Sequence, residues 1–385
     1  MNNSFSLQAL RGHIRPWTEG LDWVVLLAVA WLMGLGLLCM YSAGFDHGTR
    51  FVDHLRNGLL SLALMFAMAQ VPPQRLVKIA VPLYTVGVLL LLATALFGVT
   101  KKGATRWLNV GITQIQPSEI LKIAMPLMLA WWFQKREGLL RLPDFVAAFV
   151  LLAVPVGLIA KQPDLGTSLL VLAAGLYVIF FAGLSWKLIL PVMVAGDIGI
   201  TALVMSEEQI CQPDVTWPVL REYQKHRVCT LLDPSKDPLG KGFHIIQGGI
   251  AIGSGGVTGK GFMKGTQTHL EFIPERTTDF IFAAYGEEFG LLGAAALLLG
   301  FTVLILRGLV IAFEAPTLFG RLMAGAVTLS FFTYVFVNMG MVSGILPVVG
   351  VPLPFISYGG TAMVMLGLSL GILLSIAKSK RYKRR

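Results

Sequence analysis

The chain consists of long apolar runs separated by short polar segments. Ten such runs lie at about 22–44, 56–71, 77–98, 115–134, 143–160, 165–184, 187–205, 280–305, 318–343 and 357–377. Crossing a hydrocarbon core of about 30 Å takes roughly 20 helical residues, so runs of this length are typical of transmembrane helices. The pattern predicts an all-α polytopic membrane protein, a single integral membrane domain over residues 1–385 with about ten transmembrane helices. The first run is too long for a signal-peptide core and no small-residue cleavage site follows it, so we interpret it as an uncleaved anchor.

One connection is much longer than the others. Residues 206–279 separate the seventh and eighth predicted helices, and connections longer than about 15 residues are usually functional or disordered. This one is aromatic and glycine-rich, which favours an ordered functional loop. It contains Cys211 and Cys229, which either form a disulfide or remain two free thiols.

Composition and charge support this organisation. Hydrophobic residues make up 55% of the chain and charged residues only 14%, against about 25% charged residues in soluble domains. If both termini are cytosolic, the inner segments hold sixteen Lys and Arg residues and the short outer loops hold six. The positive-inside rule therefore places both termini and the basic tail at 378–385 in the cytosol, and the 206–279 loop on the outer face. The net charge of +10 then needs no nucleic-acid partner to explain it.

Several common catalytic classes lack support. The chain has three cysteines without a C-x-x-C pair, and neither a P-loop nor an H-E-x-x-H motif occurs. Thiol-ligated metal centres, P-loop nucleotide hydrolysis and the common zinc-protease chemistry are therefore not indicated.

Ionisable residues inside predicted spans are candidate functional groups, because an unpaired charge in a bilayer is costly. Glu119 and Lys122 are spaced i, i+3 on the fourth predicted helix and can pair. Two interpretations stay open: the pair only neutralises itself, or it lines a groove that receives a charged head group.

Two outer segments add candidate binding residues. The first is Lys101–Trp107, in which Lys102 and Arg106 could bind phosphate oxygens and Trp107 could lie at head-group depth. The second is Gln162–Ser168, where Asp164 either caps the following helix or faces inward to hold a cation or hydroxyl.

The end of the long loop holds the strongest constellation. A glycine-rich run at 248–265 carries Lys260 and Lys264, and it is followed by Pro274–Phe280 with Arg276 and Asp279. Partial dehydration at the membrane interface makes a carboxylate a better general base. Asp279 is therefore either such a base or only the N-cap of the eighth helix.

Taken in order, these motifs resemble the shape, elongation, division and sporulation (SEDS) family, in its rod-shape-determining branch. The resemblance covers nearly the whole chain and rests on eight segments: Lys102–Trp107, Gln116–Ile120, Gln162–Thr167, Asp237–Gly240, Gly253–Gly256, Pro274–Asp279, Gly344–Gly350 and Pro352–Pro354. It departs from the family pattern at about Glu207–Leu220, which looks like an insertion, and it offers no role for Asp197 in the seventh helix.

The resemblance implies a peptidoglycan glycosyltransferase of the bacterial cytoplasmic membrane. Such an enzyme polymerises lipid II, the undecaprenyl-pyrophosphoryl disaccharide-pentapeptide, for cell elongation, with a class B penicillin-binding transpeptidase and the elongation machinery as partners. It implies that Asp279 is catalytic, and that Arg106, Glu119, Lys122 and Asp164 are functionally sensitive. A divalent cation, Mg²⁺ or Mn²⁺, is an option.

A single base suffices for this reaction, because pyrophosphate leaves as an anion that cations stabilise. The outer segments supply six cations that could surround Asp279: Lys101, Lys102, Arg106, Lys260, Lys264 and Arg276. The alternative functions are a flippase for the same lipid-linked precursor and a structural scaffold for the transpeptidase.

Overall fold

The structure is a computed structural model, and it is almost entirely helical. It describes residues 20–46, 48–101, 104–109, 114–138, 140–212, 215, 217, 222–237, 240–273 and 275–382. In the described part of the chain, ten long helices lie in the ten predicted apolar ranges: α2 (Trp23–Ala43), α3 (Arg50–Ala69), α4 (Pro73–Phe97), α5 (Pro117–Gln134), α6 (Leu142–Lys161), α7 (Leu165–Phe181), α8 (Trp186–Met205), α13 (Ile281–Glu314), α14 (Leu318–Val342) and α15 (Gly360–Tyr382). The polytopic all-α prediction is confirmed.

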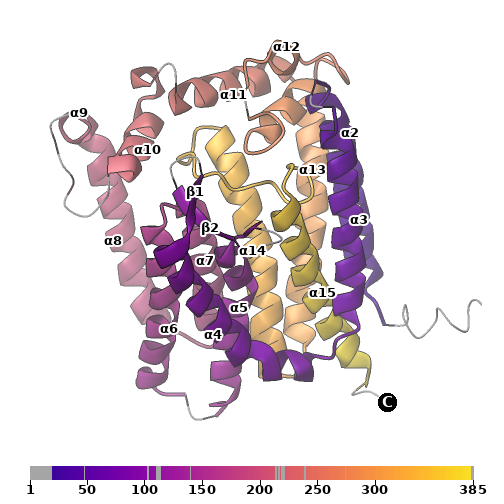
Figure 1. Ribbon diagram of the computed structural model, residues 1–385, viewed down its shortest axis with the longest axis vertical. Coiled ribbons are helices and arrows are strands. Elements are labelled where there is room, and N and C mark those ends of the chain that lie inside the picture. The colour runs from indigo at the N-terminus through magenta and orange to yellow at the C-terminus, as the bar shows by residue number, and fades with distance from the viewer. Residues whose placement is uncertain are drawn as a thin grey trace, which may run out of the picture.

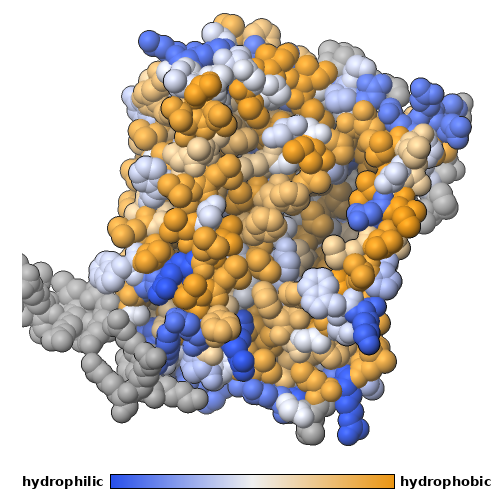
Figure 2. All heavy atoms as spheres, turned by 180° about the vertical axis from the view of Figure 1, so that it is seen from behind, coloured by the Kyte–Doolittle hydropathy of each residue, from blue (hydrophilic) through white to orange (hydrophobic). Residues whose placement is uncertain are grey.

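Seven of these helices are by themselves long and apolar enough to cross a membrane: α2, α4, α6, α8, α13, α14 and α15. The other three differ for local reasons. Helix α3 starts with a charged turn that contains Arg50 and Asp53, α5 carries Glu119 and Lys122, and α7 has only 17 residues. Figure 2 shows a hydrophobic surface over the middle of the bundle, with hydrophilic residues gathered towards its two ends.

Short polar signals set the helix boundaries. Asp22 begins α2 by accepting a hydrogen bond from the Val25 N–H at 3.3 Å, and Thr317 begins α14 in the same way. Helices α4 and α5 start with proline in their first turn, where no amide donor is needed.

The bundle has two chemically different ends (Figure 1). Helices of the long connection gather at one, which we call the loop end. At the other, which we call the termini end, Asp22 at the start of α2 pairs with Arg307 of α13 at 2.6 Å, beside a cavity that Lys380 of α15 also lines.

The core lies around α14, whose side chains are mostly buried against α13, α7 and α5. Helix α15 packs along α3. Helix α8 stands apart, since none of its side chains is buried, and in Figure 1 it lies at the margin of the bundle.

The long connection is ordered into short helices, as its composition indicated. These are α9 (Glu207–Ile210), α10 (Glu222–Leu232), the 3₁₀ helix η1 (Pro234–Lys236), α11 (Lys241–Gly255) and α12 (Thr266–His269). A disulfide joins Cys211 to Cys229, so the bridged alternative is the one found. It connects the insertion to α10.

Two features differ from the sequence-based expectation. The segment between α4 and α5 forms a small antiparallel sheet with strand order β1-β2-β3. Its strands are β1 (Val99–Lys101), β2 (Ala104–Asn109) and β3 (Gln114–Ile115). Its threonines and its tryptophan favour strands. In addition, α13 runs to Glu314 and is interrupted at Gly290, where φ is 61° and ψ is −159°.

Candidate active site

Asp279 lies at the loop end, in the turn that precedes α13. The N-cap residue of α13 is Phe280, and it makes no side-chain cap. The interpretation of Asp279 as the N-cap is therefore wrong. Its side chain is half-buried, and its carboxylate lies against Gly350, since a Cβ added at Gly350 would lie 3.3 Å from Oδ2. Gly350 has a φ of +77° that few other residues adopt, so a glycine here lets backbone approach the carboxylate.

The turn that carries Asp279 is fixed by the connection between α14 and α15. The Asn338 amide of α14 donates to the Asp279 carbonyl at 3.0 Å and to the Val351 carbonyl at 2.7 Å. The Ser357 hydroxyl donates to the Thr278 carbonyl at 2.7 Å. The apolar Pro/Gly backbone of this connection is thus buried against the turn, as irregular backbone at membrane depth must be.

Arg50 at the start of α3 adds a further support that the sequence analysis missed. Its guanidinium donates to the Thr277 hydroxyl and lies 5.5 Å from the centre of the Tyr358 ring. The Tyr358 amide in turn donates to the Thr277 carbonyl at 2.8 Å. The sequence alone did not distinguish Arg50 from the other arginines of the predicted outer loops, so its contact with Thr277 could not be predicted.

A second polar cluster surrounds Asp164. The carboxylate caps α7 by accepting from the Thr167 amide at 3.2 Å, and its other oxygen accepts from the Gln116 side chain at 2.8 Å. Arg106 of β2 lies 3.7 Å from the same carboxylate, and its Nε is buried without a hydrogen-bond partner. The capping interpretation of Asp164 is therefore confirmed, whereas a role in holding a substrate hydroxyl or a cation stays a prediction. Gln116 lies in one of the eight segments that carry the family resemblance, but the sequence analysis gave it no role of its own.

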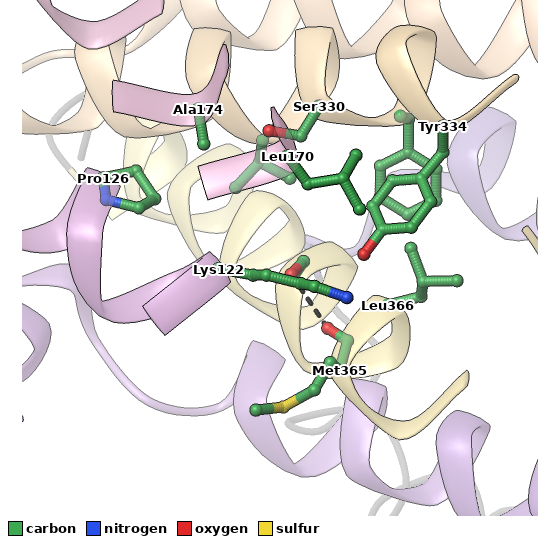
Figure 3. A pocket seen from close by; sticks show the side chains of 11 residues that line it. Lys122, Pro126, Leu170, Ala174, Ser330, Tyr334, Met365 and Leu366 are labelled. Carbon is green, nitrogen blue, oxygen red and sulfur yellow. Dashed lines mark hydrogen bonds between the residues drawn. The ribbon is translucent and has the colours of Figure 1, made fainter. Parts of the chain in front are cut away.

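The predicted pair on α5 is formed. Lys122 Nζ lies 2.5 Å from Glu119 Oε1, and about one tenth of each side chain is exposed. Figure 3 shows the Lys122 amine pointing toward the hydroxyl of Tyr334 on α14. A cavity of about 20 Å³, lined by both residues, has room for about one water molecule. Glu119 Oε2 makes no hydrogen bond.

The Asp279 and Asp164 clusters meet across the same stretch of backbone. At the start of α7, a Cβ added at Gly166 would lie 2.8 Å from the Val349 carbonyl oxygen, just as one at Gly350 would meet Asp279. Arg227 of α10 donates to the Val348 carbonyl at 3.0 Å. Residues 348–351 therefore lie between the two carboxylates and beneath the long connection.

The remaining predicted cations have different environments. Lys260 lies 2.7 Å from Glu287, and the buried Arg276 lies 2.5 Å from Asp46 near the end of α2. Lys264 is exposed. Lys102 falls outside the described residues. Trp107, which follows Arg106 in β2, is half-buried. The structure thus brings Arg106 to Asp164, and it gives Lys260 and Arg276 carboxylate partners.

Among the described residues there is no group of three or more His, Cys, Asp or Glu side chains that could hold a metal ion. Magnesium usually binds through one or two carboxylates together with substrate phosphates and waters. A single carboxylate at Asp279 fits that mode of binding.

Comparisons with known proteins match nearly the whole chain to one family. Residues 22–382 match the family model for cell cycle proteins of the FtsW, RodA and SpoVE type. The chain is 48% identical over 361 residues to the peptidoglycan glycosyltransferase MrdB of Escherichia coli K12, covering 92% of this chain and 93% of that protein. It is 30% identical over 419 residues to the peptidoglycan glycosyltransferase RodA of Treponema pallidum, covering 92% of this chain and 97% of that one.

Solved structures are also similar. One, described as the structural coordination of polymerization and crosslinking by a peptidoglycan synthase complex, gives a TM-score of 0.77 at 32% identity, covering 94% of this chain and 98% of the other. The crystal structure of the rod shape determining protein RodA of Thermus thermophilus gives a TM-score of 0.68 at 28% identity, covering 94% and 97%.

Proposed function

The chain belongs to the FtsW/RodA/SpoVE family of cell cycle proteins and is a peptidoglycan glycosyltransferase of the elongation type; from this premise we propose that it polymerises lipid II with Asp279 as general base. The observation that carries the proposal is the placement of Asp279. Its carboxylate is half-buried at the loop end, on a turn fixed by Asn338, Ser357 and Arg50.

The reaction joins the 4-hydroxyl of one lipid-linked disaccharide to the anomeric carbon of another chain's terminal sugar. The new C–O bond forms as the bond between the anomeric carbon and the pyrophosphate oxygen breaks. Asp279 accepts the hydroxyl proton, and the lipid pyrophosphate departs with the bonding electrons. An in-line displacement inverts the anomeric centre, so an α-linked donor gives a β-linked glycan. Glycosidases need a second carboxylic acid to protonate the leaving sugar, whereas pyrophosphate leaves as a stabilised anion.

The leaving pyrophosphate needs positive charge nearby. Arg106 is the best-placed candidate, since its Nε is unpaired and its side chain is about one third exposed beside Asp164. Lys102 and Trp107 of the same segment, and the exposed Lys264 of the long connection, are further candidates for binding the substrate head group. If a Mg²⁺ or Mn²⁺ ion binds, Asp279 would hold it, and the ion would supply further positive charge for the leaving group.

The buried pair of Glu119 and Lys122 lies on the helix that starts at Gln116, the amide partner of Asp164. We propose that it lines the path of the lipid-linked substrate into the site. Holding an ion pair inside the bundle costs desolvation energy, and a role in substrate binding would explain why the pair is there. Glu119 Oε2 has no hydrogen-bond partner and could accept one from the substrate.

We also propose an orientation and a partner. The positive-inside distribution supports cytosolic termini in a bacterial inner membrane, with the loop end and Asp279 on the outer face. A class B penicillin-binding transpeptidase of the elongation machinery would act next to it. The similar synthase complex, whose description couples polymerization to crosslinking, supports this partnership.

The test is polymerisation by purified full-length protein supplied with lipid II. Asp279→Asn keeps the shape of the side chain but not its basicity, so the rate should fall by about 10²- to 10⁴-fold while the protein stays folded. Asp53→Asn is the matched control, because Asp53 is a carboxylate of the first turn of α3 that lies 3.1 Å from the exposed Arg56. Substantial glycan synthesis by Asp279→Asn would remove Asp279 from the mechanism.

A further inference from the structure

Glu287 of α13 is a fully buried carboxylate that the proposed reaction does not use. Its oxygens accept from five donors of the glycine-rich connection: Lys260 Nζ at 2.7 Å, the Thr266 hydroxyl at 3.1 Å, the Gln267 amide at 2.9 Å, and the amide and hydroxyl of Thr268, both at 3.1 Å. An ionised carboxylate only accepts hydrogen bonds, so this set of donors selects Glu287 in its charged form.

The same region of α13 is joined to the connection through its backbone. The helix is interrupted at Gly290, and residues 256–261 lie in the gap. Four hydrogen bonds link the two segments: Leu291 N to Gly256 O at 3.0 Å, Leu292 N to Val257 O at 3.1 Å, Lys260 N to Glu287 O at 3.0 Å and Gly261 N to Glu288 O at 3.0 Å. Gly259 makes the approach possible, because a Cβ there would lie 2.1 Å from the Glu288 carbonyl oxygen.

These contacts close a loop of chain that contains Asp279. Glu287 lies eight residues after Asp279 and holds Gln267 and Thr268, which lie twelve and eleven residues before it. Both ends of the segment 269–286 are therefore attached at one point. The turn that carries Asp279 lies between α12 and α13, so its position depends on the hydrogen bonds between Glu287 and residues 267–268.

We infer that Glu287 is a positioning residue for Asp279, and that Lys260 acts through Glu287 rather than on the substrate. The inference rests on the proposed base role of Asp279. Lys260 is the cation that balances the buried charge of Glu287, and its ammonium already donates to Glu287 and to Thr266 at 2.7 Å each. A displacement of about 1 Å at a reacting group can cost on the order of 10² in rate, so a loosened attachment should be visible in turnover.

The experiment compares purified full-length variants by lipid II polymerisation and by hydrogen exchange of peptides that cover residues 262–272. Glu287→Gln replaces one acceptor oxygen by an NH₂ group, which cannot accept hydrogen bonds from the donors of Lys260 and residues 266–268. We therefore expect its kcat to fall by about 10- to 100-fold with KM nearly unchanged, and the Gln267 and Thr268 amides to exchange faster. Lys260→Met should show a smaller effect of the same kind, and Lys260→Arg should largely restore activity. Glu137→Gln is the matched control, since Glu137 is an exposed carboxylate 3.9 Å from Arg321.

The double variant Glu287→Gln/Lys260→Met separates the two roles of Lys260. If Lys260 acts through Glu287, adding Lys260→Met to Glu287→Gln changes neither kcat nor KM further. A rise in KM in both backgrounds would show that Lys260 binds substrate, and would overturn that part of the inference. Unchanged amide exchange in Glu287→Gln would overturn the attachment itself. Faster exchange together with an active Asp279→Asn variant would instead contradict only the proposed base.

Discussion

Removing one member of the Glu119–Lys122 pair should destabilise the protein strongly. The two charged atoms lie 2.5 Å apart and about nine tenths of each side chain is buried. Deleting one partner of such a pair leaves an uncompensated charge and typically costs about 3–5 kcal/mol. Glu119→Gln or Lys122→Met should therefore lower both the yield of folded protein from membranes and its resistance to heat.

The double variant Glu119→Met/Lys122→Met distinguishes the two interpretations of the pair. Replacing a buried ion pair by hydrophobic side chains of similar size is often neutral or even stabilising, so heat resistance should return close to the wild-type value. Polymerisation of lipid II should not return if the pair lines the substrate path. The two readouts are the fraction of monodisperse protein that survives heating and the initial rate of glycan synthesis per folded molecule.

Two results would refute this reasoning. Normal abundance and heat resistance in both single variants would show that the pair is not held in a low-dielectric environment. Recovery of stability and full polymerisation together in the double variant would show that the charges only neutralise one another. In the second case neither charge contributes to the substrate path.

Two further predictions concern the loop end. Serine replacement of both Cys211 and Cys229 should leave the initial rate of polymerisation nearly unchanged, because the bridge lies in and beside the insertion; a large loss of rate in folded protein would make the insertion part of the site. Gly350→Ala should lower the rate about 10- to 100-fold in protein of nearly normal abundance, because its Cβ would lie 3.3 Å from Asp279 Oδ2 and its φ is +77°. Gly34→Ala is the control, because a Cβ there meets nothing within 4 Å. Equal rates for the two variants would contradict the contact.

Regular features of the chain could be predicted from its sequence because they depend on local spacing. Apolar runs of membrane-spanning length gave all ten helices. The i, i+3 spacing gave the Glu119–Lys122 pair, and the position of Asp164 before an apolar run gave its capping bond to Thr167. Each of these follows from the geometry of a single helix.

The rest depends on contacts between segments far apart in the chain. Asn338 reaches Asp279 across 59 residues and Arg50 reaches Thr277 across 227, and no local pattern reports such a distance. The interruption of α13 could not be predicted either, because a glycine such as Gly290 is also common where two helices pack closely. Its role is clear only from the structure, in which the backbone of residues 256–261 binds α13 on both sides of Gly290. Gln116 was missed for the same reason, since its partner Asp164 lies 48 residues away.

The cations at the loop end fall into two groups, those paired with a carboxylate inside the protein and those that could bind the substrate. This division could not be predicted from the sequence. Six lysines and arginines were expected around the pyrophosphate, yet Lys260 is paired with Glu287 and the buried Arg276 with Asp46. Both residues hold the segment that carries Asp279 rather than opening toward it. Arg106, which is about one third exposed beside Asp164, and the exposed Lys264 are then the described cations of this set that remain available to a leaving pyrophosphate.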